Sequence, residues 1–534
     1  MKSEKEAAPR EGWSSRTGIL ALTLLVAALL LVGAVRGRLL GTPLERDEGE
    51  YAYAGQLLLQ GSPPYAHVYN MKFPGTYVAY ALIEATLGET IEGIHFGLLL
   101  LNMATVIVLF LVGKRLFGNT GAAVAGASYA LLSLNPSVLG TSAHATHFVV
   151  LPTMVGLLLL LDASKSGRPS TTYLSGLMFG LAFLMKQHAM FFLCFAVLFF
   201  SWERLRHRTS LRGFLRETVL LMAGLATPLA FTVLILWWAG VWDSFWFLTF
   251  SYAREYVSIV TASEGLVNLG REFPRVVGPS VAIWVLAAIG LVAAIRDPES
   301  FRKRLLLLFA GFSALTVCPG LYFRPHYFVT VLPAVALLAA AGVSPIARSL
   351  SRAAGVPWES VAMGIAVLAL GASIWSQYLI FFRFTPKEVS RVMYGLEPFP
   401  EAVEIGRWLR AQPGKENPVL VLGAEPEIYF YSGRRSATGY IYVYSVWENQ
   451  LYADSMMRQM IREVEDSRPQ YVIVEFVPKR LQGWTAEFLN RSYMLEGRVD
   501  MISSAQTEYL WGAEASTKPG RARRYLYVFK RVAE

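Results

Sequence analysis

An acidic pair, Asp47 and Glu48, lies in a short polar segment that directly follows the first apolar stretch of the chain. Charged side chains at the end of a membrane-spanning helix are costly unless they are used. The same loop continues through several tyrosines and prolines to Lys72 before the chain becomes apolar again. A carboxylate, an ammonium group and aromatic rings at the boundary between water and lipid suit a substrate that is itself partly lipid. We therefore expect this loop to carry the reaction.

The composition is typical of a polytopic membrane protein. Of the 534 residues, 54% are hydrophobic and only 16% are charged. A soluble chain of this length divides into several domains with more charged surface. Apolar windows of about 20 residues, the length that spans a bilayer, recur from residue 18 to about residue 380 and then stop. We expect a membrane domain over residues 1–380 and an extramembrane domain over residues 381–534.

The apolar windows predict about eleven transmembrane helices. The first is longer than the apolar core of a signal peptide and lacks a clean cleavage site, so we interpret it as a true span. The two shortest are also consistent with one broken helix. The predicted spans are 18–35, 94–113, 122–140, 148–161, 172–184, 189–202, 218–239, 280–295, 305–318, 326–343 and 359–380.

Lysine and arginine residues between the spans predict the orientation. With a cytoplasmic N-terminus, the inner loops hold about twice as many of these residues as the outer loops before residue 381, in a shorter total length. The positive-inside rule therefore places the N-terminus in the cytoplasm, and an odd number of spans places the C-terminal domain outside. The long first loop, residues 36–93, then lies on the outer side. The net charge of +10 follows from this asymmetry, so we expect no nucleic-acid partner.

Histidines gather on the predicted outer side, which indicates a polar outer cavity, although a single interfacial histidine is more often a packing residue. No helix carries them at the spacing of a metal site. We expect no metal or other cofactor to be required, although Asp47 and Glu48 could bind a divalent cation weakly. The six outer histidines are His67, His95, His144, His147, His188 and His326.

The residues after 380 have the pattern of a small α/β domain, in which strands alternate with helices. Both cysteines, Cys194 and Cys318, lie in predicted spans, so this domain must fold without disulfides. Its first strand ends in a glycine turn but lacks the full G-x-G-x-x-G, so it gives little support for nucleotide binding. The predicted strands are 418–423, 471–476 and 525–529, and the predicted helices are 425–431 and 453–466.

Three stretches resemble motifs of glycosyltransferase family 39. The first outer loop reads Arg46-Asp47-Glu48-Gly49-Glu50-Tyr51 and later Lys72-x-Pro74-Gly75; residues 322–328 read Tyr-Phe-Arg-Pro-His-Tyr-Phe, and residues 429–435 read Tyr-Phe-Tyr-Ser-Gly-Arg-Arg. These are similar to stretches of polyprenyl-phosphate-dependent membrane glycosyltransferases of the GT-C fold. The family includes protein O-mannosyltransferases and bacterial transferases that add aminoarabinose to lipid A. The layout agrees over most of the chain.

The resemblance implies an inverting transfer of a hexosyl or pentosyl group at the outer face of a bacterial cytoplasmic membrane. The hydroxyl of a lipid, glycan or protein acceptor would attack the anomeric carbon of a sugar carried on polyprenyl phosphate. The resemblance assigns Asp47 as the base for that hydroxyl. A base must lie within hydrogen-bond reach, and partial burial is expected to raise its pKa. The structural alternative is an ion pair of Asp47 with Arg46 or Arg38 that only anchors the loop.

The remaining candidates surround this base. Three roles are open for Glu48: it would orient the base, hold the acceptor, or only cap a helix in the loop. The leaving phosphate needs compensating positive charge. Lys72 matches the family's lysine before proline and is the first candidate; a lysine that only extends to the interface is the alternative. The further candidates are Arg324 with His326 and Tyr327 beside it, then Lys186 and Arg254.

One departure from the lipid A transferases concerns the residue before this lysine. Many of those enzymes have an acidic residue there, and this chain has Met71. The departure argues against a second carboxylate from the lysine loop and against the aminoarabinose assignment.

Two other classes of protein stay open. A transporter or flippase of lipid-linked sugars would usually show internal repeats and broken helices near the membrane midplane. The chain shows no convincing repeat, and its ionisable residues gather at one face. A non-catalytic assembly protein with an external binding domain would leave Asp47 unexplained. The sequence therefore favours a transferase.

Overall fold

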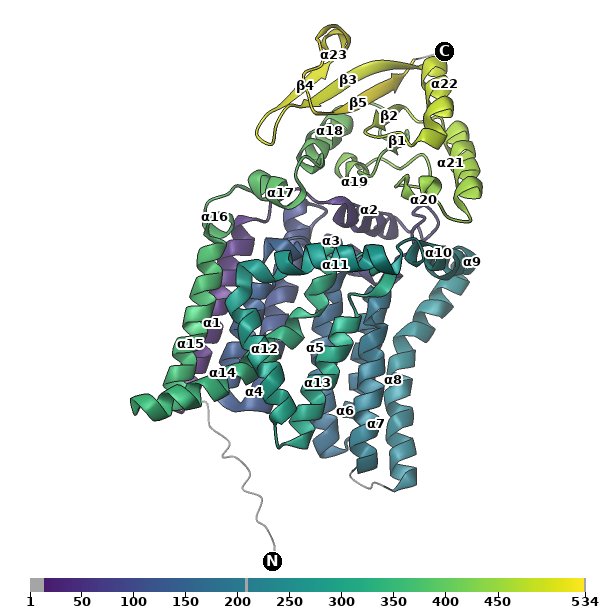
Figure 1. Ribbon diagram of the computed structural model, residues 1–534. Coiled ribbons are helices and arrows are strands. Elements are labelled where there is room, and N and C mark those ends of the chain that lie inside the picture. The colour runs from purple at the N-terminus through teal and green to yellow at the C-terminus, as the bar shows by residue number, and fades with distance from the viewer. Residues whose placement is uncertain (1–13, 207–209, 533–534) are drawn as a thin grey trace, which may run out of the picture.

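Long apolar helices stand side by side at one end of the molecule, and a mixed sheet with its own helices forms the other end (Figure 1). The structure is a computed structural model that describes residues 14–206 and 210–532. Within these residues, eight helices are long and apolar enough to cross a membrane. They are Arg16–Arg38 (α1), Ile91–Leu132 (α4), Ala145–Ser166 (α5), Gln187–Arg206 (which contains α7, Met190–Arg206), Leu211–Trp238 (α8), Ala262–Arg296 (which contains α12, Val281–Arg296), Leu332–Ala354 (α14) and Trp358–Ser376 (α15).

Gly118 divides α4 into two arms. Its φ of 75° and ψ of −162° are not helical, and glycine adopts such a conformation without the steric cost of a side chain. The chain then turns back, so that Phe110 of the first arm packs against Gly126 of the second. Two shorter helices, Pro169–Met185 (α6) and Ser300–Leu315 (α13), stand in the same bundle (Figure 1). Each of the eleven predicted spans therefore overlaps a helix or one arm of α4, although 122–140 runs past Leu132, where α4 ends, and 326–343 begins in the 3-10 helix Pro325–Thr330 (η6).

Lys186 separates α6 from α7. Its backbone is extended, with φ −160° and ψ 137°, and the two helices that flank it pack against each other. The alternative of one broken helix over residues 172–202 is therefore not observed.

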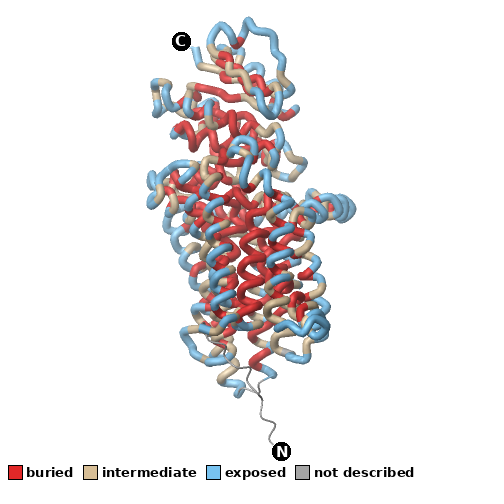
Figure 2. The backbone as a smooth tube through the Cα atoms, turned by 90° about the vertical axis from the view of Figure 1, so that its left-hand side faces the viewer, coloured by how far each residue is buried: buried red, intermediate tan, exposed pale blue. Residues whose placement is uncertain are grey.

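Small residues allow close approach of neighbouring helices in the bundle. A Cβ atom at Gly290 of α12 would lie 1.8 Å from the carbonyl oxygen of Leu338 in α14. A Cβ atom at Gly176 of α6 would lie 2.2 Å from the carbonyl oxygen of Leu221 in α8. Small residues at such contacts are typical of helices that pack within a membrane. The buried residues run along the centre of the bundle, and its outer surface is exposed (Figure 2).

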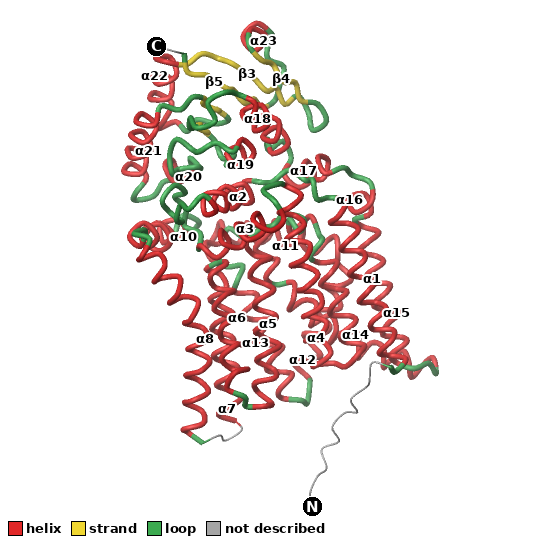
Figure 3. The backbone as a smooth tube through the Cα atoms, turned by 180° about the vertical axis from the view of Figure 1, so that it is seen from behind, coloured by secondary structure: helices red, strands yellow, loops and turns green. Residues whose placement is uncertain are grey.

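Several helices lie across the end of the bundle that faces the sheet (Figure 3). Two of them, Arg46–Leu59 (α2) and Pro74–Leu87 (α3), come from the long first loop, and a third is Ala262–Val277 (α11). Ten of the fourteen residues of α2 are buried, because the helix packs against α3 on one side and against Glu427–Ser432 (α19) of the C-terminal domain on the other. The polar loop predicted to carry the reaction is therefore a helix enclosed by both parts of the molecule.

The C-terminal domain contains a five-stranded sheet in the order β1-β2-β5-β3-β4. The first pair is parallel and the others are antiparallel. The predicted strands correspond to β1, β2 and β5, and the predicted helices to α19 and α21; the sequence analysis did not predict β3, β4 or α18. The bounds are Val419–Leu422 (β1), Tyr471–Val474 (β2), Tyr493–Met501 (β3), Thr507–Trp511 (β4), Arg524–Arg531 (β5), Phe399–Ala411 (α18) and Ala453–Ser467 (α21). The prediction of a multi-pass helical protein with a small C-terminal sheet domain is confirmed.

Candidate active site

Helix α2 begins with a reciprocal cap that involves Glu48. The side chain of Glu45 accepts a hydrogen bond from the backbone N–H of Glu48 at 3.1 Å, and Glu48 accepts one from the N–H of Glu45 at 3.2 Å. Carboxylates at a helix N-terminus are stabilised by the unpaired N–H groups and the helix dipole. Glu48 is fully buried and also lies 3.0 Å from His95 Nε2. Of the three interpretations of Glu48, the structure shows the cap.

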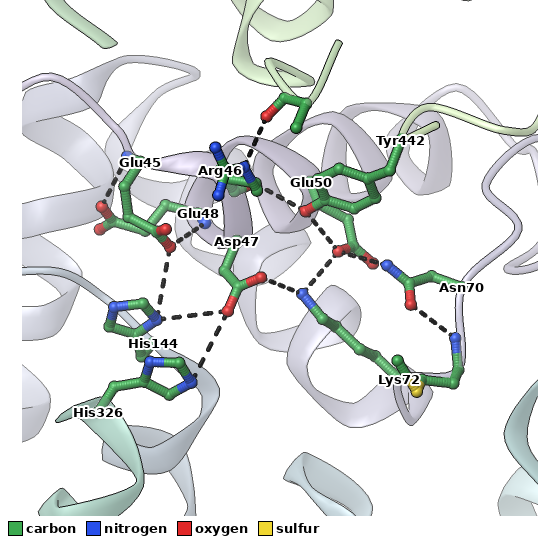
Figure 4. A network of polar contacts seen from close by, with 12 residues as sticks. Glu45, Arg46, Asp47, Glu48, Glu50, Asn70, Lys72, His144, His326 and Tyr442 are labelled. Atoms are coloured by element: carbon green, nitrogen blue, oxygen red, sulfur yellow. Dashed lines mark hydrogen bonds and ion pairs between the residues drawn. The ribbon is translucent and has the colours of Figure 1, made fainter. Parts of the chain in front are cut away.

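Lys72 joins the two carboxylates that follow this cap. Its Nζ lies 2.6 Å from Asp47 Oδ1 and 2.7 Å from Glu50 Oε2 (Figure 4). The ammonium group also lies 4.5 Å from the centre of the Tyr51 ring. The loop lysine predicted to bind phosphate is therefore held by the predicted base and a second carboxylate of α2.

Glu50 anchors this arrangement, and its carboxylate is fully buried. Oε1 accepts a hydrogen bond from the Tyr77 hydroxyl at 2.5 Å. Oε2 accepts from the Tyr442 hydroxyl and from Asn70 Nδ2, both at 2.8 Å, in addition to Lys72 (Figure 4). A buried carboxylate is tolerated when its oxygens are satisfied in this way. Because Tyr442 belongs to the C-terminal domain, Glu50 also connects that domain to the loop of Lys72.

The environment of Asp47 differs from the expected one. Burial alone would raise the pKa of Asp47, but the nearby ammonium of Lys72 and the contacts with His144 and His326 outweigh it. Together they hold the pKa of the Asp47 carboxyl well below its usual value. The expectation of a raised pKa at this residue was therefore wrong, because the sequence did not show that Lys72 lies in contact with it. Asp47 is therefore ionised at neutral pH.

Two stacked histidines lie beside Asp47. Its Oδ2 lies 3.7 Å from His144 Nδ1 and 3.9 Å from His326 Nε2 (Figure 4). These atoms are close enough together to suggest a metal site. However, the two imidazole rings are stacked: the angle between their planes is only 10°, and their centroids are 4.2 Å apart. A metal ion lies in the plane of each imidazole that binds it, so these two rings cannot share an ion without a rotation. The absence of a required metal stays a prediction.

A cavity of about 390 Å³ opens beside Asp47, between the bundle and the C-terminal domain. Besides Lys72, it is lined by Arg46, which pairs with Glu397, and by Lys186 and Arg324. Lys186 Nζ lies 4.2 Å from the centre of the Tyr327 ring. Arg324 Nη2 lies 3.2 Å from the Tyr256 hydroxyl, and its guanidinium is exposed to the cavity. Neither Lys186 nor Arg324 forms an ion pair with a carboxylate among residues 14–206 and 210–532. Both cations are therefore available to an anionic ligand.

Burial affects the protonation of Lys186. It lowers the pKa of this ammonium group to about 7, and the neighbouring cations Lys72 and Arg324 lower it while Asp47 raises it. An anion in the cavity would favour the charged form. The charge of this lysine therefore changes near neutral pH.

The cavity brings together most of the predicted site residues, which come from helix α2 and from three connections between helices. Two others do not line the cavity: Glu48 is a buried residue of α2, and Arg254 is exposed on the short helix Ala253–Val257 (α10). The predicted residues that line the cavity are Asp47, Lys72, Lys186, Arg324, His326 and Tyr327.

Sequence analysis missed Glu50, Tyr256, Tyr442 and Glu448 at this site. Glu50 had a usable signal, because residues three apart on a helix share a face, and Glu50 stands three residues after Asp47. The loop had to be recognised as a helix for that signal to apply. The other three had no signal in the sequence, because only the tertiary fold brings them to Asp47.

The chain is similar to known proteins in part of its sequence and in its overall structure. Residues 73–238 match the family model of dolichyl-phosphate-mannose-protein mannosyltransferase. The structure is similar to ArnT from Cupriavidus metallidurans bound to undecaprenyl phosphate, at 16% sequence identity and a TM-score of 0.61, covering 97% of this chain and 99% of that one. The chain has a GT-C fold.

Two further structures agree with the GT-C assignment. ArnT from Cupriavidus metallidurans in the apo state is 17% identical, with a TM-score of 0.60 and coverage of 96% of this chain and 98% of that one. The archaeal oligosaccharyltransferase AglB from Archaeoglobus fulgidus, in complex with an inhibitory peptide and a dolichol-phosphate, is 14% identical, with a TM-score of 0.52 and coverage of 93% and 75%. No curated protein matches the chain by sequence. The resemblance inferred from the motifs is confirmed at the level of the GT-C fold.

Proposed function

We propose that the protein is an inverting glycosyltransferase. It moves a sugar from polyprenyl phosphate to the hydroxyl of a lipid, glycan or protein acceptor, at the outer face of a bacterial cytoplasmic membrane. The observation that carries this proposal is the presence of Asp47 in one cavity with Lys72, Lys186 and Arg324, besides Arg46, which is paired with Glu397. A proton acceptor beside a site for a leaving phosphate is what this transfer requires. The similar structures of ArnT and AglB, which contain undecaprenyl phosphate and dolichol-phosphate, support the donor class.

The transfer forms one bond and breaks one. The acceptor oxygen bonds to the anomeric carbon on the face opposite the phosphate, and its proton passes to Asp47. The bond from that carbon to the phosphate oxygen breaks, and the electron pair leaves with polyprenyl phosphate. Because the pKa of Asp47 is low, the proton moves only as the carbon–oxygen bond forms.

Lys72 couples the two ends of this reaction. In the free protein it lowers the pKa of Asp47 by direct contact. A phosphate that draws the ammonium group away from Asp47 weakens that effect, so the carboxylate becomes a stronger base when the donor is bound. Lys72 therefore acts on both the base and the leaving group, while Lys186 and Arg324 bind the phosphate.

The position of the charges disfavours the alternative of a transporter. Substrate sites of transporters lie near the membrane midplane, at helices that are broken there. Here the cavity lies at the end of the bundle next to the C-terminal domain, which forms part of its wall. The arrangement suits a reaction at the surface better than passage across the membrane.

The proposal is tested by incubating the purified protein with a panel of polyprenyl-phosphate sugars and measuring free polyprenyl phosphate. Water serves as the acceptor in one series, and a membrane extract supplies acceptors in a parallel one. We expect release from at least one donor, faster with the extract. Binding of donors without release of polyprenyl phosphate in either series would contradict the proposal.

A further inference from the structure

The C-terminal domain contributes a carboxylate to the wall of the cavity. Glu448 follows the short helix Tyr444–Trp447 (α20) and lines the same cavity as Asp47. It is half-buried, and its side-chain partner within the described residues is the hydroxyl of Tyr252, 3.4 Å from Oε2. Some partly buried carboxylates of this domain are paired with cations, as Glu397 is with Arg46 and Glu475 is with Arg524. Glu448 has spare hydrogen-bond acceptors directed at an open space.

Two tyrosines on one helical segment connect Glu448 to the proposed phosphate site. Tyr252 ends the π-helix Phe247–Tyr252 (η3), and Tyr256 follows four residues later on α10. Short π-helical segments within helices are frequent at functional sites. The hydroxyl of Tyr256 contacts Arg324, and the hydroxyl of Tyr252 contacts Glu448. The two tyrosines that contact Arg324 and Glu448 therefore stand about one helical turn apart on one wall of the cavity.

This separation suits a single sugar ring. Residues four apart on a helix have Cβ atoms about 5–6 Å apart, which is comparable to the width of a pyranose. A phosphate bound at Arg324 would place the attached ring between Arg324 and Glu448. A carboxylate can accept hydrogen bonds from two neighbouring hydroxyls, and a tyrosine hydroxyl can donate or accept one.

Resting on the proposed transfer, we infer that Glu448 and Tyr252 bind ring hydroxyl groups of the sugar that is being transferred. Trp447, which also lines the cavity and is 39% exposed, offers an apolar face for the C–H groups of the ring. The C-terminal domain thereby selects the donor sugar. Burial raises the pKa of Glu448 to about 7, in agreement with a carboxylate that lacks donors until a ligand supplies them.

The test uses matched donors that differ by one ring hydroxyl. Hydrolysis of each donor is measured for the wild type, Glu448→Gln and Tyr252→Phe, with Glu487→Gln as a control on an exposed glutamate of the same domain. Hydrogen bonds to charged groups contribute enough to discriminate about tenfold or more. We expect Glu448→Gln to raise the donor KM about tenfold and to lose the discrimination between the matched donors. Tyr252→Phe should have the same effect to a smaller degree, and Glu487→Gln should have none.

Other outcomes would overturn the inference. Wild-type hydrolysis with unchanged donor selectivity in both variants would reject it and leave the proposed transferase intact. An increase in the acceptor KM alone, in reactions with membrane extract, would move these contacts to the acceptor. Preference for a donor with an ammonium group in place of the hydroxyl would reject the hydroxyl assignment. Absence of hydrolysis by the wild type with every donor would reject both proposals.

Discussion

At the scale of single residues, Asp47 and Lys72 form the centre of the site as one ion pair. The sequence predicted both as functional and placed them on the same side of the membrane. It did not predict their contact, because the contact depends on how the loop between α2 and α3 folds back. The 2.6 Å separation of Lys72 Nζ and Asp47 Oδ1 reverses the expected direction of the pKa of Asp47.

Lys186 should give the reaction an alkaline limit. Burial lowers its pKa to about 7, so its ammonium form is present below that pH and is lost as the pH rises through it. A phosphate that links a sugar to a lipid keeps one negative charge over this range. We therefore expect kcat/KM for the donor to fall above about pH 7, by roughly tenfold to a hundredfold when the charge is lost, in donor hydrolysis measured from pH 5 to 9.

Two substitutions distinguish Lys186 from other titrating groups. Lys186→Arg keeps a charge at every pH and should remove the alkaline fall, whereas Lys186→Met should be slow at every pH. If kcat/KM for the donor still falls at alkaline pH in both variants, another group must cause the fall.

Removal of metal ions should leave the reaction unchanged. The ring nitrogens of His144 and His326 lie in nearly parallel planes, which does not suit one shared ion. We expect dialysis against a chelator to preserve the rate of donor hydrolysis. A loss of activity that added divalent cations restore would show that the rings rotate to bind a metal beside Asp47.

At the scale of elements, helix α2 holds the site because it is enclosed on both sides. Gly49 allows α2 to lie close to α19 of the C-terminal domain. A Cβ atom there would lie 2.5 Å from the backbone nitrogen of Glu427. We expect Gly49→Ala to separate the two helices, to cost about 1–3 kcal/mol in stability and to reduce donor hydrolysis, since Asp47 and Glu50 flank this glycine.

The control for Gly49 is Gly483→Ala. Gly483 lies in the exposed helix Gln482–Ser492 (α22) and has no atom within 4 Å of an added Cβ. The Gly483→Ala substitution should leave stability unchanged or raise it slightly, because alanine favours a helix by up to about 1 kcal/mol over glycine. Thermal unfolding and donor hydrolysis of the two purified variants decide the comparison, and equal behaviour would contradict the close packing of α2 on α19.

Whether a helix or strand could be predicted from the sequence depended on its hydrophobic pattern. The transmembrane helices could be predicted because each is a long apolar run. The strand β3 could not, because Arg498 and Asp500 stand in its middle and Gly497 lies at an irregularity in its pairing with β5. The structure explains these charges, since the side chains of Arg498 and Asp500 pair at 2.7 Å and are buried together. A charge pair of this kind is invisible to a pattern of apolar residues.

At the scale of the whole molecule, the cavity lies where the bundle and the C-terminal domain meet. The cavity and the C-terminal domain must therefore be on the same side of the membrane. We propose that this is the outer side, with a cytoplasmic N-terminus. In a Cys194→Ser, Cys318→Ser background, Ser504→Cys in the C-terminal domain should react with a membrane-impermeant maleimide in intact cells. Ser166→Cys at the other end of the bundle should react only after lysis; both serines are exposed. The reverse pattern would place the domain in the cytoplasm.

The most direct test of the central claim compares the wild type with Asp47→Asn in the release of polyprenyl phosphate. Asparagine keeps the size of the side chain but cannot take up the acceptor proton. Loss of a general base typically slows a reaction 10²–10⁴-fold, so we expect a loss of that order, with unchanged release by Asp243→Asn, a control at an exposed aspartate outside the cavity. Release by Asp47→Asn at the wild-type rate would contradict the assignment of Asp47 as the base.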